Sequence, residues 1–142
     1  TAANLRDLAQ QHNITIRLQT NPGTIRGNRA LLERAFSNLI ENAIKYNRPS
    51  GTVTVRAAPE AAAFRVEITD EGTGIPQEFR EQIFEPFFRI EPSRSRQLGG
   101  AGLGLSLVRA VIDLHNGTVE VENAPGGGSC FTVVLPCRKE AC

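Results

Sequence analysis

The apolar positions of the chain recur with two different spacings, and the spacing changes from one segment to the next. Apolar residues three or four positions apart predict a helix, and strict alternation predicts a strand. Three segments have the helical spacing: residues 1–12, 28–47 and 104–115. Five segments have the alternating spacing: residues 14–18, 53–57, 64–68, 119–121 and 130–135. The chain therefore combines helices with strands.

Turn residues and one irregular stretch separate these segments. Pro49, Ser50 and Gly51 end the long helix, and three consecutive glycines at 126–128 form a turn before the last strand. Residues 77–84 predict a short helix. Residues 85–102 are rich in Pro, Arg, Ser and Gly and have no clear period, so we expect a mobile loop there.

The pattern predicts a two-layer α/β sandwich. About five strands would form a mixed, largely antiparallel sheet, and the three main helices would cover one of its faces. The chain has 142 residues and shows no internal repeat or linker, so we expect a single domain over residues 1–142.

Composition and charge narrow the class of protein. The net charge is +1, so no overall basic field would recruit nucleic acid. Apolar residues make up 40% of the chain, but no stretch approaches the roughly 20 apolar residues of a membrane span. We find no signal peptide and expect a cytoplasmic domain.

The cysteines and histidines do not predict a metal centre. Cys130, Cys137 and Cys142 are odd in number and lack the spacing of a zinc site. Cys130 lies in an apolar run and is expected in the core. Reduced thiols or a bridge between Cys137 and Cys142 both remain open. His12 and His115 lack companion ligands, which favours a structural or solvated role.

The long helix carries a polar stripe at one helical face. Asn38, Glu41, Asn42 and Lys45 stand at i, i+3, i+4 and i+7, so they share a side that we expect opposite the apolar one. An ordinary wet helix surface would explain the spacing, but two asparagines are poor choices for a helix interior. Amide oxygens, a carboxylate and an ammonium together suit a magnesium–phosphate group.

Two glycine-containing segments add to this stripe. Asp70 falls just past a predicted buried strand and is followed by Gly72 and Gly74, so its carboxylate could accept a hydrogen bond from an exocyclic amine while the backbone approaches a flat base. A simple turn is the alternative. Further along, glycines at 99–104 open directly into a helix, where backbone N–H groups can hold an anion. A flexible hinge is the alternative there.

The order and the distances of these motifs resemble the catalytic ATP-binding domain of sensor histidine kinases, which has the GHKL or Bergerat fold. Five segments resemble that family's N box, first glycine box, F box, second glycine box and final glycine segment: residues 38–47, 70–74, 83–89, 100–106 and 126–132. The resemblance covers nearly the whole chain. Asn28 stands where many relatives have Asp, and we expect it to cap the long helix.

The resemblance implies a site for ATP and Mg²⁺ between the long helix and a lid at about 85–102. Asn42 would coordinate Mg²⁺, Asn38 could share the ion, and Asp70 would accept from the adenine amino group. Asn38, Lys45 and Arg89 would act in the transfer itself. The residues expected to contact the nucleotide are Asn38, Asn42, Lys45, Tyr46, Asp70, Gly72, Gly74, Ile75, Phe84, Arg94, Arg96, Gly100, Gly102, Leu103, Gly104, Leu105 and Thr132. Phe84, Phe87 and Phe88 would anchor the lid.

The resemblance also implies partners. Neither His12 nor His115 has the context of the family's phosphoacceptor histidine, so we expect that histidine on a separate helical dimerisation domain of the same kinase. A response regulator would be the next partner. The domain by itself is expected to be monomeric, and the parent kinase a homodimer in a membrane-anchored bacterial sensor.

The sequence disfavours three other classes of protein. ATPases of the gyrase, heat-shock-90 and mismatch-repair type use a glutamate where this chain has Asn38, and asparagine cannot accept a proton at neutral pH, so hydrolysis should be negligible. The F box and the long lid argue against an anti-sigma serine kinase. A regulatory module that has lost ATP chemistry should show damaged N or glycine boxes, and these are intact.

Overall fold

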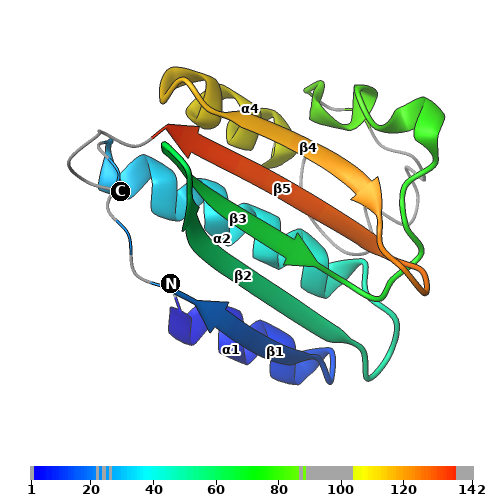
Figure 1. Ribbon diagram of the computed structural model, residues 1–142. Helices are drawn as coiled ribbons and strands as arrows, with labels where there is room; N and C mark the ends of the chain where they lie inside the picture. The colour runs from blue at the N-terminus through cyan, green and yellow to red at the C-terminus, as the bar shows by residue number, and fades with distance from the viewer. Residues whose placement is uncertain are drawn as a thin grey trace.

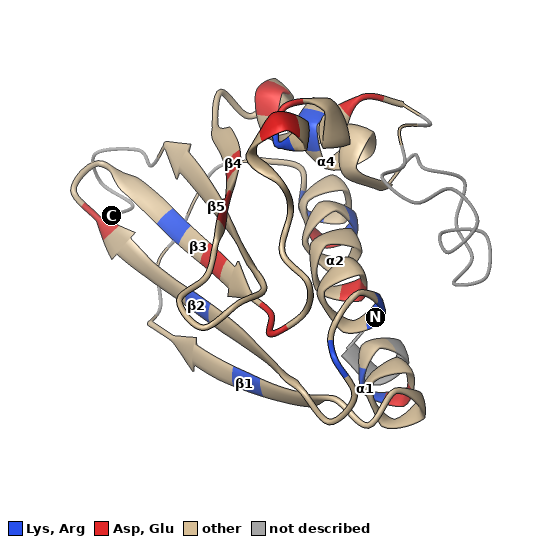
Figure 2. Ribbon diagram, turned by 90° about the vertical axis from the view of Figure 1, so that its right-hand side faces the viewer, with Lys and Arg blue, Asp and Glu red and all other residues tan. Residues whose placement is uncertain are grey.

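The computed structural model describes residues 2–21, 23, 25, 27–86, 88 and 104–136, with side chains from Leu5 onward. Five strands form one sheet, and the helices lie behind it in Figure 1. Figure 2, a side view, shows the sheet and the helices as two separate layers. The predicted two-layer α/β sandwich is confirmed.

The sheet has the strand order β1-β2-β3-β5-β4. Its strands are β1 (Thr15–Thr20), β2 (Thr52–Glu60), β3 (Ala63–Thr69), β4 (Thr118–Asn123) and β5 (Ser129–Pro136). β1 runs parallel to β2, and the other three pairs are antiparallel. The mixed, largely antiparallel sheet expected from the alternating segments is therefore present, with β1 and β4 as its edges.

Among the described residues, three α-helices cover one face of the sheet, as predicted. They are α1 (Ala2–Gln11), α2 (Arg29–Lys45) and α4 (Gly104–Leu114). The Asn28 side chain accepts a hydrogen bond from the Leu31 N–H at 3.1 Å and caps α2, as expected for this residue type. Within the described residues, no helix is both long and apolar enough to cross a bilayer.

The single short helix predicted over residues 77–84 is wrong. Two separate 3₁₀ turns stand there instead, η1 (Gln77–Phe79) and η2 (Gln82–Phe84). Their backbone bonds span three residues, as in Phe79 N–H to Pro76 O and Phe84 N–H to Glu81 O. Glu85 after the second turn has an extended backbone, as expected for a residue before proline, and this ends the turn at Phe84 ahead of Pro86.

Alternation along the strands decides which side chains reach the core. In β5, Phe131, Val133 and Leu135 are buried against the helices. Cys130 has the opposite parity and is only half-buried on the outer face, which corrects its expected place in the core. Leu18, the last apolar residue of the alternating segment 14–18, lies on the edge strand β1 and is 64% exposed.

Candidate functional site

The polar stripe of α2 lies beside the core and not opposite it. Asn38, Glu41, Asn42 and Lys45 are all half-buried. Residues three apart on a helix are neighbours, so Asn42 borders on Leu39, which is fully buried. The expectation of a fully opposite face is therefore corrected. A stripe that is half-shielded by protein suits ligand contacts better than a freely solvated surface does.

Lys45 is already engaged by a neighbour on the same stripe. Its Nζ lies 2.8 Å from Oε1 of Glu41, and its side chain is 18% exposed against 40% for Glu41. Glutamate four residues before lysine is the favourable order for a helical ion pair. An anionic ligand that contacts Lys45 has to share or replace this carboxylate.

Asp70 is a buried carboxylate at the end of β3. It is 6% exposed, and its Oδ1 accepts hydrogen bonds from the N–H of Gly72 at 2.9 Å and of Ser129 at 3.1 Å. Burial raises the pKa of Asp70 above its ordinary value of 3.8, and these two hydrogen bonds partly oppose the rise. Within the described part of the chain, Oδ2 is left available to accept from a ligand.

Close approaches hold the loop after β3 in place. A Cβ on Gly72 would overlap the backbone carbonyl oxygen of Tyr46, just past α2. A Cβ on Gly128 would overlap the carbonyl oxygen of Asp70, and Gly128 has φ +84. The loop thus lies between the end of α2 and the turn before β5. Gly72 therefore permits an approach to protein backbone, in addition to any approach to a base.

Ser129 was missed by the sequence reasoning, which named Thr132 instead. Ser129 is 4% exposed, and its backbone bonds Asp70 in both directions, since its O also accepts from the Asp70 N–H at 2.9 Å. Thr132 pairs in register with Glu67 and Glu120 on the outer face of the sheet. The structure does not bring Thr132 together with Asp70. Strand parity could have shown that Ser129 is buried, because it alternates with Phe131 and Val133, but not that it contacts Asp70.

Phe84 anchors the segment that leads into residues 85–102. It is 6% exposed and meets Phe131 edge to face at a centroid distance of 6.2 Å. The Arg109 guanidinium of α4 lies 5.1 Å from the centre of the Phe84 ring, within the range of a cation–π contact. Phe88 packs against Phe79 at 5.7 Å. The predicted packing of Phe84 and Phe88 is present.

The remaining candidates divide into two groups. Tyr46, Gly74, Ile75, Gly104 and Leu105 are half-buried, and Ile75 N–H donates to the Asn123 side chain at 3.2 Å. The other nucleotide-site candidates lie outside the described residues: Arg89, Arg94, Arg96, Gly100, Gly102 and Leu103. Phe87, Cys137, Cys142 and nearly all of the predicted lid lie outside the described residues as well.

The described residues contain no group of three His, Cys, Asp or Glu side chains that could hold a metal. The possible metal ligands on α2 are instead the side-chain amide oxygens of Asn38 and Asn42. Mg²⁺ accepts oxygen ligands and keeps several waters and phosphate oxygens of its own. Two half-buried amide oxygens beside a lysine therefore fit a magnesium ion that is bound together with a phosphate chain.

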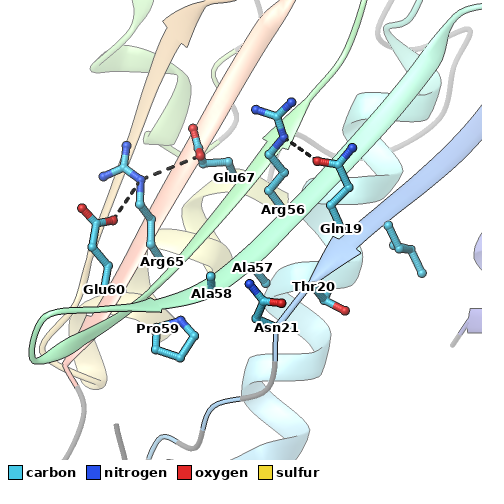
Figure 3. A pocket seen from close by; sticks show the side chains of 11 residues that line it. Gln19, Thr20, Asn21, Arg56, Ala57, Ala58, Pro59, Glu60, Arg65 and Glu67 are labelled. Atoms are coloured by element: carbon cyan, nitrogen blue, oxygen red, sulfur yellow. Dashed lines mark hydrogen bonds and ion pairs between the residues drawn. The ribbon is translucent and has the colours of Figure 1, made fainter.

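A groove of about 650 Å³ lies on the other face of the sheet, over β1, β2 and β3 (Figure 3). Its charged groups already have partners, since Arg56 Nε donates to Gln19 Oε1 at 2.9 Å. Arg65 Nε lies 3.7 Å from Glu60 and 3.9 Å from Glu67. This groove is a solvated sheet face with paired charges and is separate from the stripe on α2.

Comparison with known proteins agrees with this geometry. Residues 27–139 match the family described as histidine kinase-, DNA gyrase B- and HSP90-like ATPase. The chain belongs to this family. The sensor-like histidine kinase SenX3 of Mycobacterium tuberculosis is 41% identical over 132 residues, which cover 91% of this chain and 32% of the relative. The sensor histidine kinase CpxA of Escherichia coli is 35% identical over 129 residues, which cover 91% and 28%.

Solved structures narrow the class to the catalytic ATP-binding domain of sensor histidine kinases. The mycobacterial sensor histidine kinase MprB has a TM-score of 0.83 at 31% identity and covers 96% of this chain and 91% of that chain. The catalytic domain of the histidine kinase ThkA has a TM-score of 0.78 at 27% identity, covering 95% and 91%. The histidine kinase fold predicted from the motifs is confirmed.

Two further structures were solved as complexes. ShkA in complex with AMPPNP has a TM-score of 0.75 at 27% identity, and the match covers 99% of this chain and 30% of that chain. ThkA in complex with the response regulator TrrA has a TM-score of 0.78 at 26% identity, covering 97% and 38%. The chain spans about a third of the length of the curated relatives it matches.

Proposed function

We propose that this domain binds MgATP beside α2 and donates the γ-phosphoryl group to a histidine on a separate helical dimerisation domain of the same kinase. One observation carries the proposal. The loop with the buried Asp70 packs against the end of α2, since the Gly72 position lies directly on the Tyr46 carbonyl. This contact brings Asp70, which can accept a hydrogen bond from a base, close to the end of α2 that carries Asn42 and Lys45. The ShkA complex with an ATP analogue supports the same ligand class.

In this proposal Asp70 recognises the base. Its Oδ1 is occupied by the Gly72 and Ser129 N–H groups, so Oδ2 accepts from the exocyclic amine of adenine. Guanine carries a carbonyl oxygen at the corresponding position, and two acceptors facing each other would leave both unpaired. Tyr46, Gly74 and Ile75 border the base or ribose.

The triphosphate lies along the stripe of α2. Asn42 and Asn38 hold the Mg²⁺, which neutralises charge that develops on the phosphate oxygens. Lys45 leaves Glu41 and contacts phosphate. Phosphate contacts from the second glycine box and the lid complete the site: Gly100, Gly102, Leu103, Gly104, Leu105, Arg89, Arg94 and Arg96. Phe84 holds the start of the lid on α4 and β5.

The reaction follows from positioning and charge. An imidazole nitrogen of the acceptor attacks the γ-phosphorus in line, the bond between γ-phosphorus and the bridging oxygen breaks, and ADP leaves. Water is not activated, because the Asn38 amide cannot take its proton. The phosphohistidine would then serve a response regulator, a partner class supported by the ThkA complex with TrrA. The domain alone is a monomer, and the parent kinase is a membrane-anchored homodimer.

The test uses γ-labelled ATP, Mg²⁺ and the domain with and without its helical partner domain. We expect an acid-labile label on the partner domain only and almost no free phosphate. Asn42→Ala should remove the Mg²⁺-dependent part of ATP binding while the fold stays intact. Rapid phosphate release by the domain alone, or an acid-stable label on it, would assign the chain to a hydrolytic or serine-directed branch of the family.

A further inference from the structure

Asn47, the residue after the C-cap of α2, links three segments through its side chain. Its Oδ1 accepts hydrogen bonds from the N–H of Arg48 at 2.8 Å and from the N–H of Glu71 at 3.2 Å. Its Nδ2 donates to the carbonyl oxygen of Thr52 at 3.1 Å. One amide therefore connects the end of α2, the start of β2 and the loop that follows β3.

Glu71, in the loop after β3, also bonds to the start of β2 and to the residue after Asn47. Its Oε1 accepts from the Thr52 N–H at 2.8 Å and from Arg48 Nη2 at 3.3 Å. The Arg48–Glu71 ion pair is largely exposed, with 62% and 45% of the side chains accessible, so its own contribution is small. The bonds to backbone groups are the structural part of this clasp, which consists of Asn47, Arg48, Thr52 and Glu71.

The bond from Asn47 acts on the peptide next to the base acceptor. The N–H of Glu71 belongs to the peptide unit that joins Asp70 to Glu71. On the other side, the N–H of Asp70 donates to Ser129 O at 2.9 Å. The N–H groups of the peptide units before and after Asp70 thus both have partners, one on β5 and one on Asn47. Together with the Gly72 and Ser129 N–H bonds to Oδ1, these two bonds set the direction of the Asp70 side chain.

The space around the clasp leaves little room for adjustment. A Cβ on Gly51 would overlap the Asn47 side-chain oxygen, and one on Gly72 would overlap the Tyr46 carbonyl oxygen. Loss of the Asn47 oxygen would leave the Glu71 N–H without its partner and free the loop to shift relative to α2. A displacement of about 1 Å at a recognition group is enough to weaken recognition strongly.

We propose that Asn47 is a positioning residue for base discrimination, acting through Asp70. This inference rests on the proposed function, since it assumes that Asp70 reads the base. The opposing view is that Asn47 only joins α2 to β2 through Thr52. The two views separate because the two ends of the amide serve different segments: the oxygen holds the loop after Asp70, and the nitrogen holds β2.

Two substitutions at Asn47 use this separation. Asn47→Asp keeps an oxygen acceptor for the Glu71 N–H but sets a carboxylate against the Thr52 carbonyl, so stability should fall while base discrimination stays. Asn47→Ala removes both bonds. Asn47→Ser keeps the local bond to the Arg48 N–H, but its shorter side chain does not span to Glu71, so it stands in for the alanine variant if that protein does not fold.

The experiment measures the Kd of MgATP and of MgGTP for each variant by calorimetry, well below the lowest melting temperature. Ile112→Val, in the core of α4 and away from the clasp, is the matched control for lost stability. We expect Asn47→Ala and Asn47→Ser to weaken ATP binding about five- to tenfold, as for one lost hydrogen bond, with GTP binding almost unchanged. Asn47→Asp and Ile112→Val should keep the wild-type ratio of the two affinities within about twofold.

If Asn47→Ala or Asn47→Ser lowers the melting temperature but keeps the wild-type ratio of ATP affinity to GTP affinity, Asn47 is structural only. A lower ratio in Ile112→Val would also overturn the inference, because loss of stability alone would then explain the effect. If the wild-type domain binds ATP and GTP equally, or neither, the proposed function itself fails. The wild-type measurement thus distinguishes that failure from a failure of the positioning role.

Discussion

The imidazole of His115, just past the end of α4, accepts a hydrogen bond from the backbone N–H of Asn28 at the start of α2, with Nε2 and N 2.9 Å apart. Its Nδ1 lies 2.7 Å from the carbonyl oxygen of Val111, to which it donates. With Nε2 accepting from the Asn28 N–H and Nδ1 facing a carbonyl oxygen, the two contacts fit the tautomer that carries its hydrogen on Nδ1. A structural or solvated role was expected for this histidine, and the structural one is present: the contact connects the two helices that flank the proposed nucleotide site.

We predict that His115→Ala destabilises the domain by about 1–2 kcal/mol, because the N–H at the N-cap of α2 loses its partner. The measurement is the free energy of unfolding in urea near neutral pH. Leu114→Ala is the matched control, since Leu114 is the adjacent residue and is 68% exposed. Equal stabilities of the two variants would contradict the structural role of the imidazole.

We predict that Asp70→Asn makes the fold more stable at neutral pH but weakens ATP binding. Burial raises the pKa of the Asp70 carboxyl in the folded state, so the folded protein binds this proton more tightly than the unfolded chain does. The resulting stabilisation is complete below the unfolded pKa of about 3.8 and is lost as the pH rises through the higher folded pKa. At neutral pH the buried charge is a net cost. The neutral amide removes it and keeps an oxygen for the Gly72 and Ser129 N–H groups, so we expect a higher melting temperature.

The same substitution should weaken ATP binding by roughly 10- to 100-fold, as for one lost hydrogen bond to a charged group. In the wild-type domain, ATP affinity should decline as the pH is lowered through the raised pKa of Asp70, at a higher pH than an ordinary aspartate would give. Asp70→Asn should lack this step. An ATP affinity equal to that of the wild type would remove Asp70 from the base site.

The turn before β5 provides a test of the close packing around Asp70. Gly126 and Gly128 both have left-handed φ values, +81 and +84, but a Cβ at Gly126 meets no atom within 4 Å. Gly126→Ala should therefore cost only the backbone strain, about 1 kcal/mol. Gly128→Ala adds a Cβ that overlaps the Asp70 carbonyl oxygen, and such overpacking typically costs a further 1–3 kcal/mol.

Chemical denaturation of both variants checks this difference. Gly128→Ala should also weaken ATP binding, since relief of the overlap moves Asp70, whereas Gly126→Ala should bind ATP as the wild type does. Similar unfolding free energies for the two alanine variants would mean that the turn adapts without disturbing Asp70.

Hydrophobic periodicity predicts the layers of this fold because it reports which side of each element faces the core. The helical spacing of α2 and the alternation of β5 survive into the structure almost unchanged. The same reasoning fails where local hydrogen bonding decides the backbone, as in the two 3₁₀ turns before Pro86. Periodicity also does not show which strand lies at an edge of the sheet, and Leu18 on the edge strand β1 is 64% exposed.

The motifs of the candidate site could be predicted from the sequence, but the contacts between residues of different motifs largely could not. Asp70 stands out in the sequence as a carboxylate after an apolar strand, and it is buried as that position suggests. Its contact with Ser129 depends on the pairing of β3 with β5, across 59 residues of sequence, and no local pattern contains that pairing. The clasp around Asn47 and Glu71 is hidden for the same reason.

The ion pair between Glu41 and Lys45 leads to a pair of opposite predictions for phosphate binding. Lys45 Nζ lies 2.8 Å from Glu41 Oε1, and the lysine side chain is the more buried of the two. An approaching triphosphate competes with this carboxylate for the ammonium and is also repelled by its charge. Lys45→Gln should therefore weaken ATP binding about tenfold or more, because a charge-assisted contact with phosphate is lost.

Glu41→Gln should have the opposite effect. It removes the competing carboxylate and one negative charge near the phosphates, and partly exposed ion pairs contribute about 0.2–1 kcal/mol, so ATP affinity should rise by a factor of up to about five. Calorimetry at two salt concentrations checks the sign, because the gain should shrink as salt screens the exposed charge. Glu33→Gln is the matched control, since Glu33 makes the same kind of ion pair with Arg29 in the first turns of α2, distant from Lys45 along the helix. A Glu41→Gln variant that loses ATP affinity would show that the carboxylate itself contributes to the magnesium–phosphate site.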